Sequence, residues 1–341
     1  MLVAHQFCAP LAQPLKIGLC EIRDREGILL EWRDVHGSTF GEVSPLPGLH
    51  HETLEDCLDQ LRRARSEWSK LGTVSWDDIS DFFEVFPGSF RTLPSLRFGI
   101  EQVVWQRSQT QGSIPKNKVK TSGLAIFRHS DLACRQQASG ISSAPHIPWK
   151  VKVGSNPLGE ANLIRKILLD APELKLRLDA NRSLTVQGFD IFSKILRPLA
   201  NQIDYFEDPL MEGLPKNSPF PLALDETLYE FPKEIPPEVS VLVVKPAHLG
   251  GIKAAEKLWR LARETECRMI LSSVFDSSLS QKIYGQMACH LRIDHEYHGI
   301  NTASFLKKDL GTQPLKTGGG IDPWLPWAPD QSLFTHSEEL T

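Results

Sequence analysis

Residues 174–181 read L-K-L-R-L-D-A-N and contain the pattern that decides the fold. Leu174, Leu176 and Leu178 alternate with charged residues, and a period of two is typical of a β-strand with one apolar and one polar face. A strand this apolar belongs in a sheet covered by helices, so its other face should be buried too. That face nevertheless ends at Asp179, as expected of a barrel strand that delivers a ligand to the mouth of a site. If Asp179 faces the site, Leu176 and Leu178 must face the outer helices.

From about residue 118 onward, short apolar runs alternate with helical stretches. This alternation predicts βα units and a parallel sheet, and about eight strands favour a closed TIM-like barrel of seven or eight βα units over an open sheet. The expected strands are 119–124, 148–153, 174–179, 203–207, 222–225, 239–245, 268–272 and about 298–302. The helices expected between them include 159–169, 186–196, 252–264 and 278–291.

Residues 1–110 have a different pattern, with a few strands followed by helices, which predicts a separate α+β lobe. The expected elements are strands at 27–33 and 40–43 and helices at 53–71, 76–85 and 95–109. Residues 9–24 contain two prolines and are interpreted as a long loop, which favours a lid over the site. The barrel would then span residues 111–311, and the Gly- and Pro-rich segment 312–341 would return to the first lobe.

Composition limits the classes of function. The chain has 341 residues with 41% hydrophobic and 23% charged residues, as in ordinary globular enzymes. A formal net charge of −4 gives no support for nucleic-acid binding. We expect neither a secretory signal nor a membrane span, because no apolar run approaches roughly 18 residues. The six cysteines form no C-x-x-C pair, which favours reduced thiols in a cytoplasmic protein over disulfides or zinc.

Three expected strands end in a carboxylate: Asp179, Glu207 and Asp225. The active site of such a barrel lies at the C-terminal ends of its strands, so these side chains should meet. Three like charges are unfavourable together unless they are protonated or bridged by a cation. Oxygen ligands without Cys or His suit Mg²⁺, with Mn²⁺ as a second candidate, rather than Zn²⁺. The alternative is that the three acids are unrelated and form surface salt bridges.

Lysines mark two other strand ends. Lys150 and Lys152 are two residues apart and share one face of their strand, and Lys245 ends the apolar run V-L-V-V-K. Buried lysines need a partner, which the carboxylates would supply. The alternatives are an edge strand with solvated lysines and a Lys245 that extends to solvent. In a barrel, Lys152 and Lys245 would face each other across the mouth, where repulsion and a cation would lower the pKa of both toward the range of a general base.

Five motifs occur in the order found in the enolase superfamily, which they resemble: K-V-K (150–152), L-D-A-N (178–181), Y-F-E-D-P (205–209), L-D-E (224–226) and V-V-K-P-A (243–247). The two lysines resemble its muconate-lactonising subgroup. Within that subgroup the chain resembles the o-succinylbenzoate synthase family in G-E-V-S-P-L-P-G (41–48), P-S-L-R-F-G-I-E (94–101) and S-S-V-F-D-S-S (272–278). The likeness covers about residues 1–325.

The resemblance implies a capping domain on the barrel and a Mg²⁺-dependent hydro-lyase. The family dehydrates the small carboxylate 2-succinyl-6-hydroxy-2,4-cyclohexadiene-1-carboxylate to o-succinylbenzoate in menaquinone or phylloquinone biosynthesis. Lys152 would remove the α-proton and then protonate the departing hydroxyl, Lys245 would face the opposite side as a cation, and Mg²⁺ would stabilise an ene-diolate. Further residues expected to bind substrate or to support the base and metal are Lys150, Arg177, Asn181, Ser272 and Ser273. The two serines could equally be strand-end turn residues.

Other functions remain open. An N-succinylamino acid racemase or a dipeptide epimerase of the same subgroup would use the same lysines, although epimerases usually carry Asp-x-Asp where residues 298–304 read H-G-I-N-T-A-S. A sugar-acid dehydratase is less well supported, because a His–Asp pair should replace Lys245. An alternative from another class is a barrel scaffold without catalysis.

Overall fold

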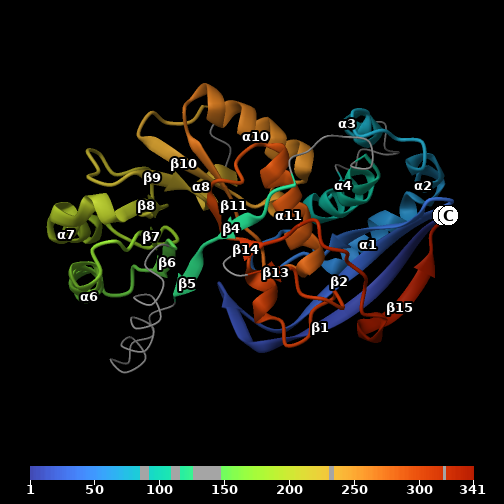
Figure 1. The fold of residues 1–341 in the computed structure, drawn as a ribbon, viewed down its shortest axis with the longest axis horizontal. Coiled ribbons are helices and arrows are strands. Elements are labelled where there is room, and N and C mark those ends of the chain that lie inside the picture. The colour runs from blue at the N-terminus through green and yellow to red at the C-terminus, as the bar shows by residue number, and fades with distance from the viewer. Residues whose placement is uncertain (85–91, 109–115, 126–146, 230–233, 318–319) are drawn as a thin grey trace.

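The computed structural model describes residues 1–84, 92–108, 116–125, 147–229, 234–317 and 320–341. The N-terminal lobe and the barrel lie side by side, and both chain termini meet at the outer edge of the lobe (Figure 1). Leu2 N donates to Thr341 Oγ1 over 2.8 Å, which joins the two ends. Cys134 and most of the segment between the first two expected barrel strands lie outside the described residues.

The N-terminal lobe is built on a four-stranded antiparallel sheet with the order β15-β1-β2-β3. Its strands are β1 (Leu2–Ile17), β2 (Cys20–Asp34), β3 (Gly37–Val43) and β15 (Phe334–Glu339). Successive residues of β2 point to opposite faces: Ile28 and Leu30 join the core under the lobe's helices, whereas Leu29 joins the core shared with the barrel. The sheet is therefore apolar on both faces.

The interpretation of residues 9–24 as a loop is wrong. They form the far half of the β1–β2 hairpin, in which Ala9 pairs with Arg25 and Leu15 with Ile22. The register shifts between Pro10 and Leu15, and β15 pairs with β1 only from Val3 to Phe7. The prolines, which cannot donate to a ladder, therefore lie at this irregularity, beyond the part of β1 that pairs with β15, where Leu11 forms an isolated bridge with Leu306. This placement explains why two prolines did not stop the strand.

Four helices of the described residues follow the sheet: α1 (Leu54–Arg63), α2 (Arg65–Leu71), α3 (Ile79–Glu84) and α4 (Pro94–Ser108). The single helix expected over 53–71 is broken at Ala64. A capping box starts α1, because Thr53 and Asp56 each accept from the other's backbone N–H. In the long α4, Leu96 and Ile100 pack in the lobe's own core, whereas Phe98 and Trp105 reach the core shared with the barrel.

The barrel is closed. Seven strands form a parallel sheet in the order β5-β6-β7-β8-β9-β10-β11. Beyond Ser122, β5 continues β4, which pairs in parallel with β12, and Ser272 after β11 bridges Gly299 after β12. With β12, the ring has the predicted eight strands. Their bounds are β4 (Val119–Thr121), β5 (Gly123–Ala125), β6 (Trp149–Lys152), β7 (Leu176–Asp179), β8 (Ile203–Glu207), β9 (Leu222–Leu224), β10 (Val239–Val244), β11 (Arg268–Leu271) and β12 (Tyr297–His298).

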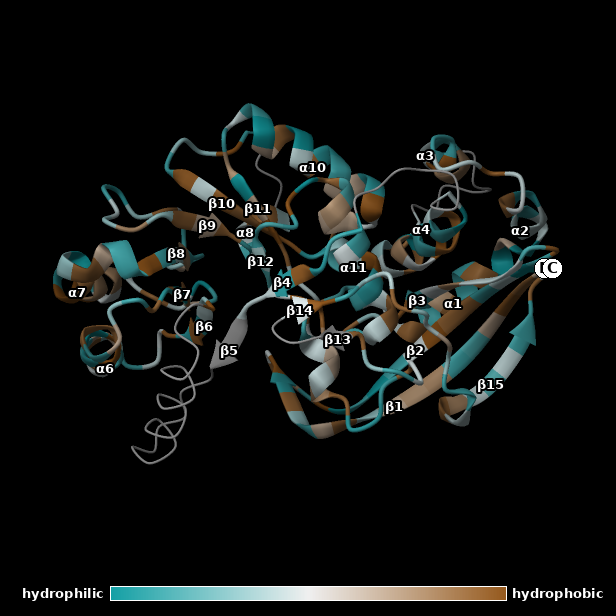
Figure 2. Ribbon diagram, in the orientation of Figure 1, coloured by the Kyte–Doolittle hydropathy of each residue, from teal (hydrophilic) through white to brown (hydrophobic). Residues whose placement is uncertain are grey.

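Four longer helices among the described residues cover the outside of the barrel: α6 (Pro157–Asp170), α7 (Val186–Leu196), α10 (Ile252–Glu264) and α11 (Ser278–His290). The short helices α8 (Glu226–Tyr229) and α9 (Pro246–Leu249) follow the ends of β9 and β10, and the 3₁₀ turn η2 (Arg197–Gln202) follows α7. Hydrophilic and hydrophobic residues alternate along α10, whereas β10 is mostly hydrophobic (Figure 2). Leu176 and Leu178 pack with Ile164 of α6 and Phe192 of α7, so the predicted outward register of β7 is confirmed.

The C-terminal segment contacts both parts of the molecule. Its strands β13 (Lys316–Thr317) and β14 (Gly320–Ile321) add to β4 of the barrel. The 3₁₀ turns are η3 (Thr302–Phe305), after β12, and η4 (Gln331–Leu333), which leads into β15 and back to the lobe's sheet. We propose that the capping lobe ends at residue 110 and the barrel at residue 311.

The composition also led us to expect reduced cysteines and no membrane-spanning segment. Cys8, Cys20, Cys57, Cys267 and Cys289, the cysteines within the described ranges, are free thiols. In the same ranges, the longest apolar helix falls short of what a membrane crossing requires.

Arg25 of β2 joins the lobe to the barrel. Its side chain is buried and donates to the carbonyls of Ser44 (2.6 Å), Pro45 (3.2 Å) and Phe275 (3.1 Å). Phe275, in the loop after β11, has a left-handed φ of 60°, which a bulky residue adopts only when its surroundings hold it. The guanidinium therefore fixes a strained loop beside the mouth of the barrel.

We expect Arg25→Met to lower the free energy of unfolding by about 3 kcal/mol, because two buried carbonyls and one partly buried carbonyl lose their charged donor. Arg23→Ala is the matched control, since Arg23 pairs with Glu21 in solvent, and it should cost less than about 0.5 kcal/mol. Urea unfolding at pH 7 measures both. Equal costs for the two variants would contradict the assigned role.

His298 of β12 is buried as a neutral ring. Its Nδ1 accepts from Leu271 N over 3.0 Å, so Nε2 carries the proton and donates to Ile293 O over 3.0 Å. Burial lowers its pKa to about 4. The unfolded chain binds this proton near pH 6.5, so the stability contribution is complete above that pH and is lost as the pH falls toward 4.

Between pH 6.5 and about 4, the free energy of unfolding should fall as the pH decreases, and the wild type should lose up to about 1.4 kcal/mol more per pH unit than His298→Gln. Asp276, whose pKa burial and Glu42 raise to about 7, titrates with the opposite sign in both proteins and cancels in the difference. Unfolding curves at pH 4.5, 5.5 and 6.5 give the two slopes. Parallel slopes would show that His298 does not carry the effect.

Candidate active site

The predicted lysines and carboxylates lie at one end of the barrel. Lys152, Asp179 and Glu207 are the last residues of β6, β7 and β8, and Asp225 and Lys245 directly follow β9 and β10. Lys152 is in register with Asp179, and Asp179 with Glu207. Strands β6 and β10 are separated by β7, β8 and β9, so the two lysines stand on opposite sides of the ring with the carboxylates between them.

Each carboxylate contacts an ammonium group. Lys150 Nζ lies 2.9 Å from Asp179 Oδ2 and 2.7 Å from Glu207 Oε1. Lys152 Nζ lies 3.1 Å from the same Asp179 oxygen, and Lys245 Nζ contacts both oxygens of Asp225. Asp179 and Glu207 are fully buried, whereas 45% of the Lys152 side chain is exposed at the mouth. Lys152 is therefore the lysine of this cluster most open to a ligand.

The pKa values of this cluster follow from burial and pairing. Burial would raise the pKa of Asp179, but Lys150 and Lys152 hold it well below its ordinary value. Burial and the charges of Asp179 and Asp225 hold the pKa of Glu207 well above its ordinary value. For Lys245, burial alone would lower the pKa, but the attraction of the neighbouring carboxylates, Asp225 foremost, outweighs it and raises the pKa; the lowering expected from a bound cation stays a prediction.

The carboxylates were also predicted to hold a metal ion. Within the described ranges, no three acidic, histidine or cysteine side chains converge as metal ligands do, since Lys150 stands between Asp179 and Glu207. The donor chemistry nevertheless fits a hard cation. Glu207 Oε2 is buried and, among the described residues, lacks a hydrogen-bond partner. An oxygen donor set of this kind suits Mg²⁺ or Mn²⁺ if the Lys150 ammonium moves away from Asp179 and Glu207.

Asn181, which was expected to hydrogen-bond close to the carboxylates, lies beside Asp179 and Lys152, and the structure adds Glu226 and Tyr229. Asn181 Oδ1 accepts from Lys152 Nζ, and Asn181 Nδ2 donates to Glu226 Oε1 over 2.7 Å. Burial and the charge of Asp225 raise the pKa of Glu226 to about 7. Tyr229 Oη accepts from the backbone N–H of Lys245 over 2.6 Å. The sequence signal for Glu226 was its place at the end of the motif L-D-E (224–226), for which no role had been predicted.

The two serines after β11 differ. Ser273 is buried, and its hydroxyl contacts Gly299 O over 3.1 Å and Thr302 Oγ1 over 2.7 Å. It therefore holds the strand-end turns together. Ser272 is half-buried and pairs through its backbone N–H with Val244 O, next to Lys245. Of the two, Ser272 keeps the predicted role toward a substrate carboxylate.

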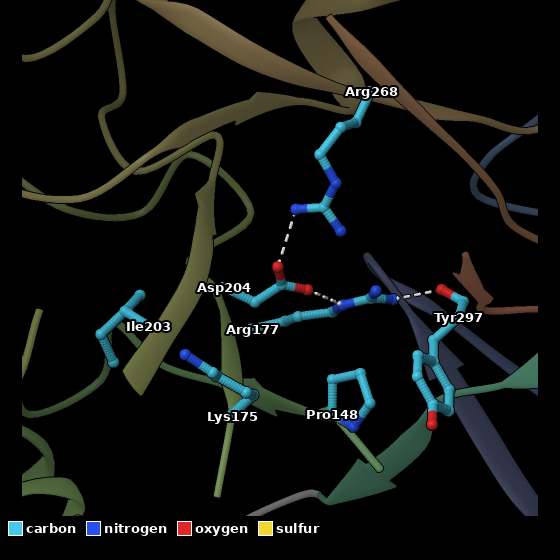
Figure 3. Close-up of a pocket in the computed structure, with 7 residues that line it drawn as sticks. All are labelled: Pro148, Lys175, Arg177, Ile203, Asp204, Arg268 and Tyr297. Carbon is cyan, nitrogen blue, oxygen red and sulfur yellow. Dashed lines mark hydrogen bonds and ion pairs between the residues drawn. The ribbon is translucent and has the colours of Figure 1, made fainter. Parts of the chain in front are cut away.

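Arg177 points away from this cluster. Its guanidinium donates to Asp204 Oδ2 over 2.8 Å and to Tyr297 O over 2.7 Å at the opposite, N-terminal end of the strands. Asp204 also binds Arg268, and these residues line a cavity of about 270 Å³ together with Lys175 and others (Figure 3). The structure thus corrects the expectation that Arg177 holds charge near the base and metal: it closes the floor of the barrel.

Known proteins resemble the chain in sequence and in fold. Residues 2–105 match the family model described as MenC, N-terminal domain. The o-succinylbenzoate synthase of Vibrio cholerae is 26% identical over 309 residues, which is 86% of each chain. The o-succinylbenzoate synthase of Proteus mirabilis is 26% identical over 317 residues, covering 90% of this chain and 91% of the relative.

Three solved structures have the same fold. An N-succinyl Arg/Lys racemase from Bacillus cereus has a TM-score of 0.76 and 16% identity, and the match covers 99% of this chain and 98% of that one. An enolase-superfamily member from Listeria innocua has a TM-score of 0.76 and 15% identity, with coverage of 99% and 97%. A dipeptide epimerase from Enterococcus faecalis, complexed with Mg and a dipeptide, has a TM-score of 0.73 and 18% identity, with coverage of 94% and 98%. The chain has the enolase-superfamily fold. The resemblance found in the sequence is confirmed, and the chain is an enzyme similar in sequence to o-succinylbenzoate synthases.

Proposed function

We propose that the enzyme dehydrates 2-succinyl-6-hydroxy-2,4-cyclohexadiene-1-carboxylate to o-succinylbenzoate, a step of menaquinone or phylloquinone biosynthesis. The observation that carries the proposal is the pair of lysines on opposite strand ends, Lys152 and Lys245, with three carboxylates between them. Similarity to o-succinylbenzoate synthases over most of the chain supports the choice of reaction.

Lys152 is the proposed base. Its amine takes the proton from the ring carbon that bears the carboxylate, and the C–H electron pair forms a ring double bond as the C–O bond breaks. The resulting ammonium returns the proton to the departing hydroxyl, so that water leaves and the ring becomes aromatic. The side chain is suited to this role because it is fixed by Asp179 and Asn181 while nearly half of it remains exposed.

Lys245 is the proposed electrostatic partner. Its raised pKa keeps it a cation, and Asp225 fixes it on the opposite side of the ring of strands. A fixed ammonium there stabilises the negative charge that develops on the substrate when the proton leaves. Lys245 is therefore assigned to stabilising charge rather than to moving a proton.

Asp179, Glu207 and Asp225 are the residues that would hold Mg²⁺ or Mn²⁺. When bound, the ion supplies positive charge to the ring carboxylate of the substrate. The buried, unpaired Glu207 oxygen supports this assignment, as does the presence of Mg in the related dipeptide epimerase structure. Lys150, between two of these carboxylates, would compensate their charge.

A substrate comparison tests the proposal. The purified enzyme with Mg²⁺ should have a higher kcat/KM for the cyclohexadiene than for N-succinyl amino acids or dipeptides. Racemisation or epimerisation without dehydration would instead favour the alternative function within the same subgroup. Turnover of none of these substrates would favour a barrel scaffold.

A further inference from the structure

A line of hydrogen bonds connects the proposed base to a residue outside the lysine–carboxylate cluster. Lys152 Nζ donates to Asn181 Oδ1, and Asn181 Nδ2 donates to Glu226 Oε1 over 2.7 Å. Glu226 is the first residue of α8 and directly follows Asp225. The line therefore runs from the end of β6, over the end of β7, to the end of β9.

The backbone holds Asn181 for this contact. Asn181 has a φ of 44° and Arg182 a φ of 60°, both in the left-handed region that asparagine tolerates better than most residues. Asn181 N donates to Asp179 Oδ1 over 3.0 Å, and Arg182 N donates to Asp208 O over 2.8 Å. These bonds fix where the amide lies but not which of its two ends faces the base.

Glu226 decides the orientation of that amide. A side-chain amide has an accepting oxygen and a donating nitrogen, and a carboxylate accepts only. With its nitrogen turned to Glu226, Asn181 must present its oxygen to Lys152. The reverse orientation would set N–H groups against an ammonium and an oxygen against a carboxylate, which are two repulsive contacts.

Glu226 contributes little to the stability of the fold. Its second carboxylate oxygen, Oε2, is buried without a hydrogen-bond partner among the described residues, and Asp225 is its neighbour in the chain. A half-satisfied carboxylate beside another acid costs stability. Residues that cost stability are more readily explained by function than by folding.

We propose that Glu226 is a positioning residue for the base: it orients the amide of Asn181, which in turn holds Lys152 toward the substrate. The inference rests on the proposed function, in which Lys152 moves the proton. It adds a residue that touches neither the reacting atoms nor Lys152 itself.

The test compares Glu226→Leu, which removes the acceptor, with Glu226→Gln, whose amide oxygen can still accept from Asn181. Glu226→Leu should lower kcat by on the order of 10- to 100-fold with KM changed less than about threefold, because a misplaced base affects the chemical step. Glu226→Gln should stay within about threefold of the wild type. Glu238→Gln, at an exposed acid before β10, is the matched control and should be neutral.

A double-mutant cycle with Asn181→Leu separates positioning from a general loss of structure. If Glu226 acts through Asn181, adding Glu226→Leu to Asn181→Leu should lower kcat by less than about twofold. Melting temperatures of the Glu226 variants should equal or exceed that of the wild type. Losses that multiply, a Gln variant as poor as the Leu variant, an unchanged kcat in Glu226→Leu, or a melting temperature that falls with activity would each overturn the inference.

The proposed function is judged separately, from the wild type alone. If the wild type racemises N-succinyl amino acids instead of dehydrating the cyclohexadiene, the proposed function fails and the same variant ratios, measured on that reaction, still decide the role of Glu226. A wild type inactive on both substrates would overturn both claims.

Discussion

Replacing Lys152 with alanine is expected to slow the formation of o-succinylbenzoate by about 10³-fold, the typical contribution of a positioned general base. The loss should fall on kcat, because the substrate carboxylate is held elsewhere in the mouth. Nearly half of the Lys152 side chain is exposed to solvent, so its removal should leave the fold intact. Steady-state kinetics with the cyclohexadiene substrate, together with far-UV circular dichroism, measures both.

Lys175→Ala provides the matched control. Lys175 precedes β7 at the floor of the barrel, where its ammonium binds the carbonyl of Asn201. It is a lysine of the same barrel but at the opposite end, so turnover should remain within about twofold of the wild type. Comparable losses in the two variants would mean that Lys152 acts through general stability or charge, and the assignment of the base would fail.

Glu207→Gln is expected to abolish the response of the protein to Mg²⁺. The wild type should melt a few degrees higher at saturating Mg²⁺, because a ligand that binds only the folded state stabilises it. In the variant this shift should vanish and turnover should fall by roughly 100-fold or more. The fold should accept the amide, because glutamine has nearly the same size and shape as glutamate and burial already disfavours the charged form of Glu207.

Glu212→Gln is the control for this experiment, because Glu212 is an exposed acid five residues further along the chain. It should keep both the Mg²⁺ shift and the activity. A full Mg²⁺ shift in Glu207→Gln would place the ion elsewhere, and the predicted trio of ligands would have to be abandoned.

The barrel could be predicted because its physical signals are local. Alternating leucines before Asp179 fixed the register of β7, and the amphipathic patterns of α7 and α10 fixed both ends of those helices. Charged residues at the ends of otherwise apolar strands then located the mouth, since parallel strands that end together bring their last residues together.

Other features depend on contacts that a local pattern does not contain. The far half of the β1–β2 hairpin carries Pro10 and Pro14, which resemble loop residues until it is known that β15 does not extend along this part of β1. Arg177 lies two residues before Asp179 and shares its inward face of β7, but its long side chain bends to Asp204 at the floor of the barrel. Glu226 lies after the end of β9, so only the fold brings it to Asn181.

Formation of o-succinylbenzoate by the purified protein, followed with Mg²⁺, after removal of divalent ions with EDTA and after Mg²⁺ is restored, tests the central claim most directly. We expect rapid dehydration with Mg²⁺, at least a 100-fold loss of turnover after EDTA and recovery of turnover when Mg²⁺ is restored. Undiminished dehydration after EDTA, or no dehydration with Mg²⁺ present, would contradict the claim.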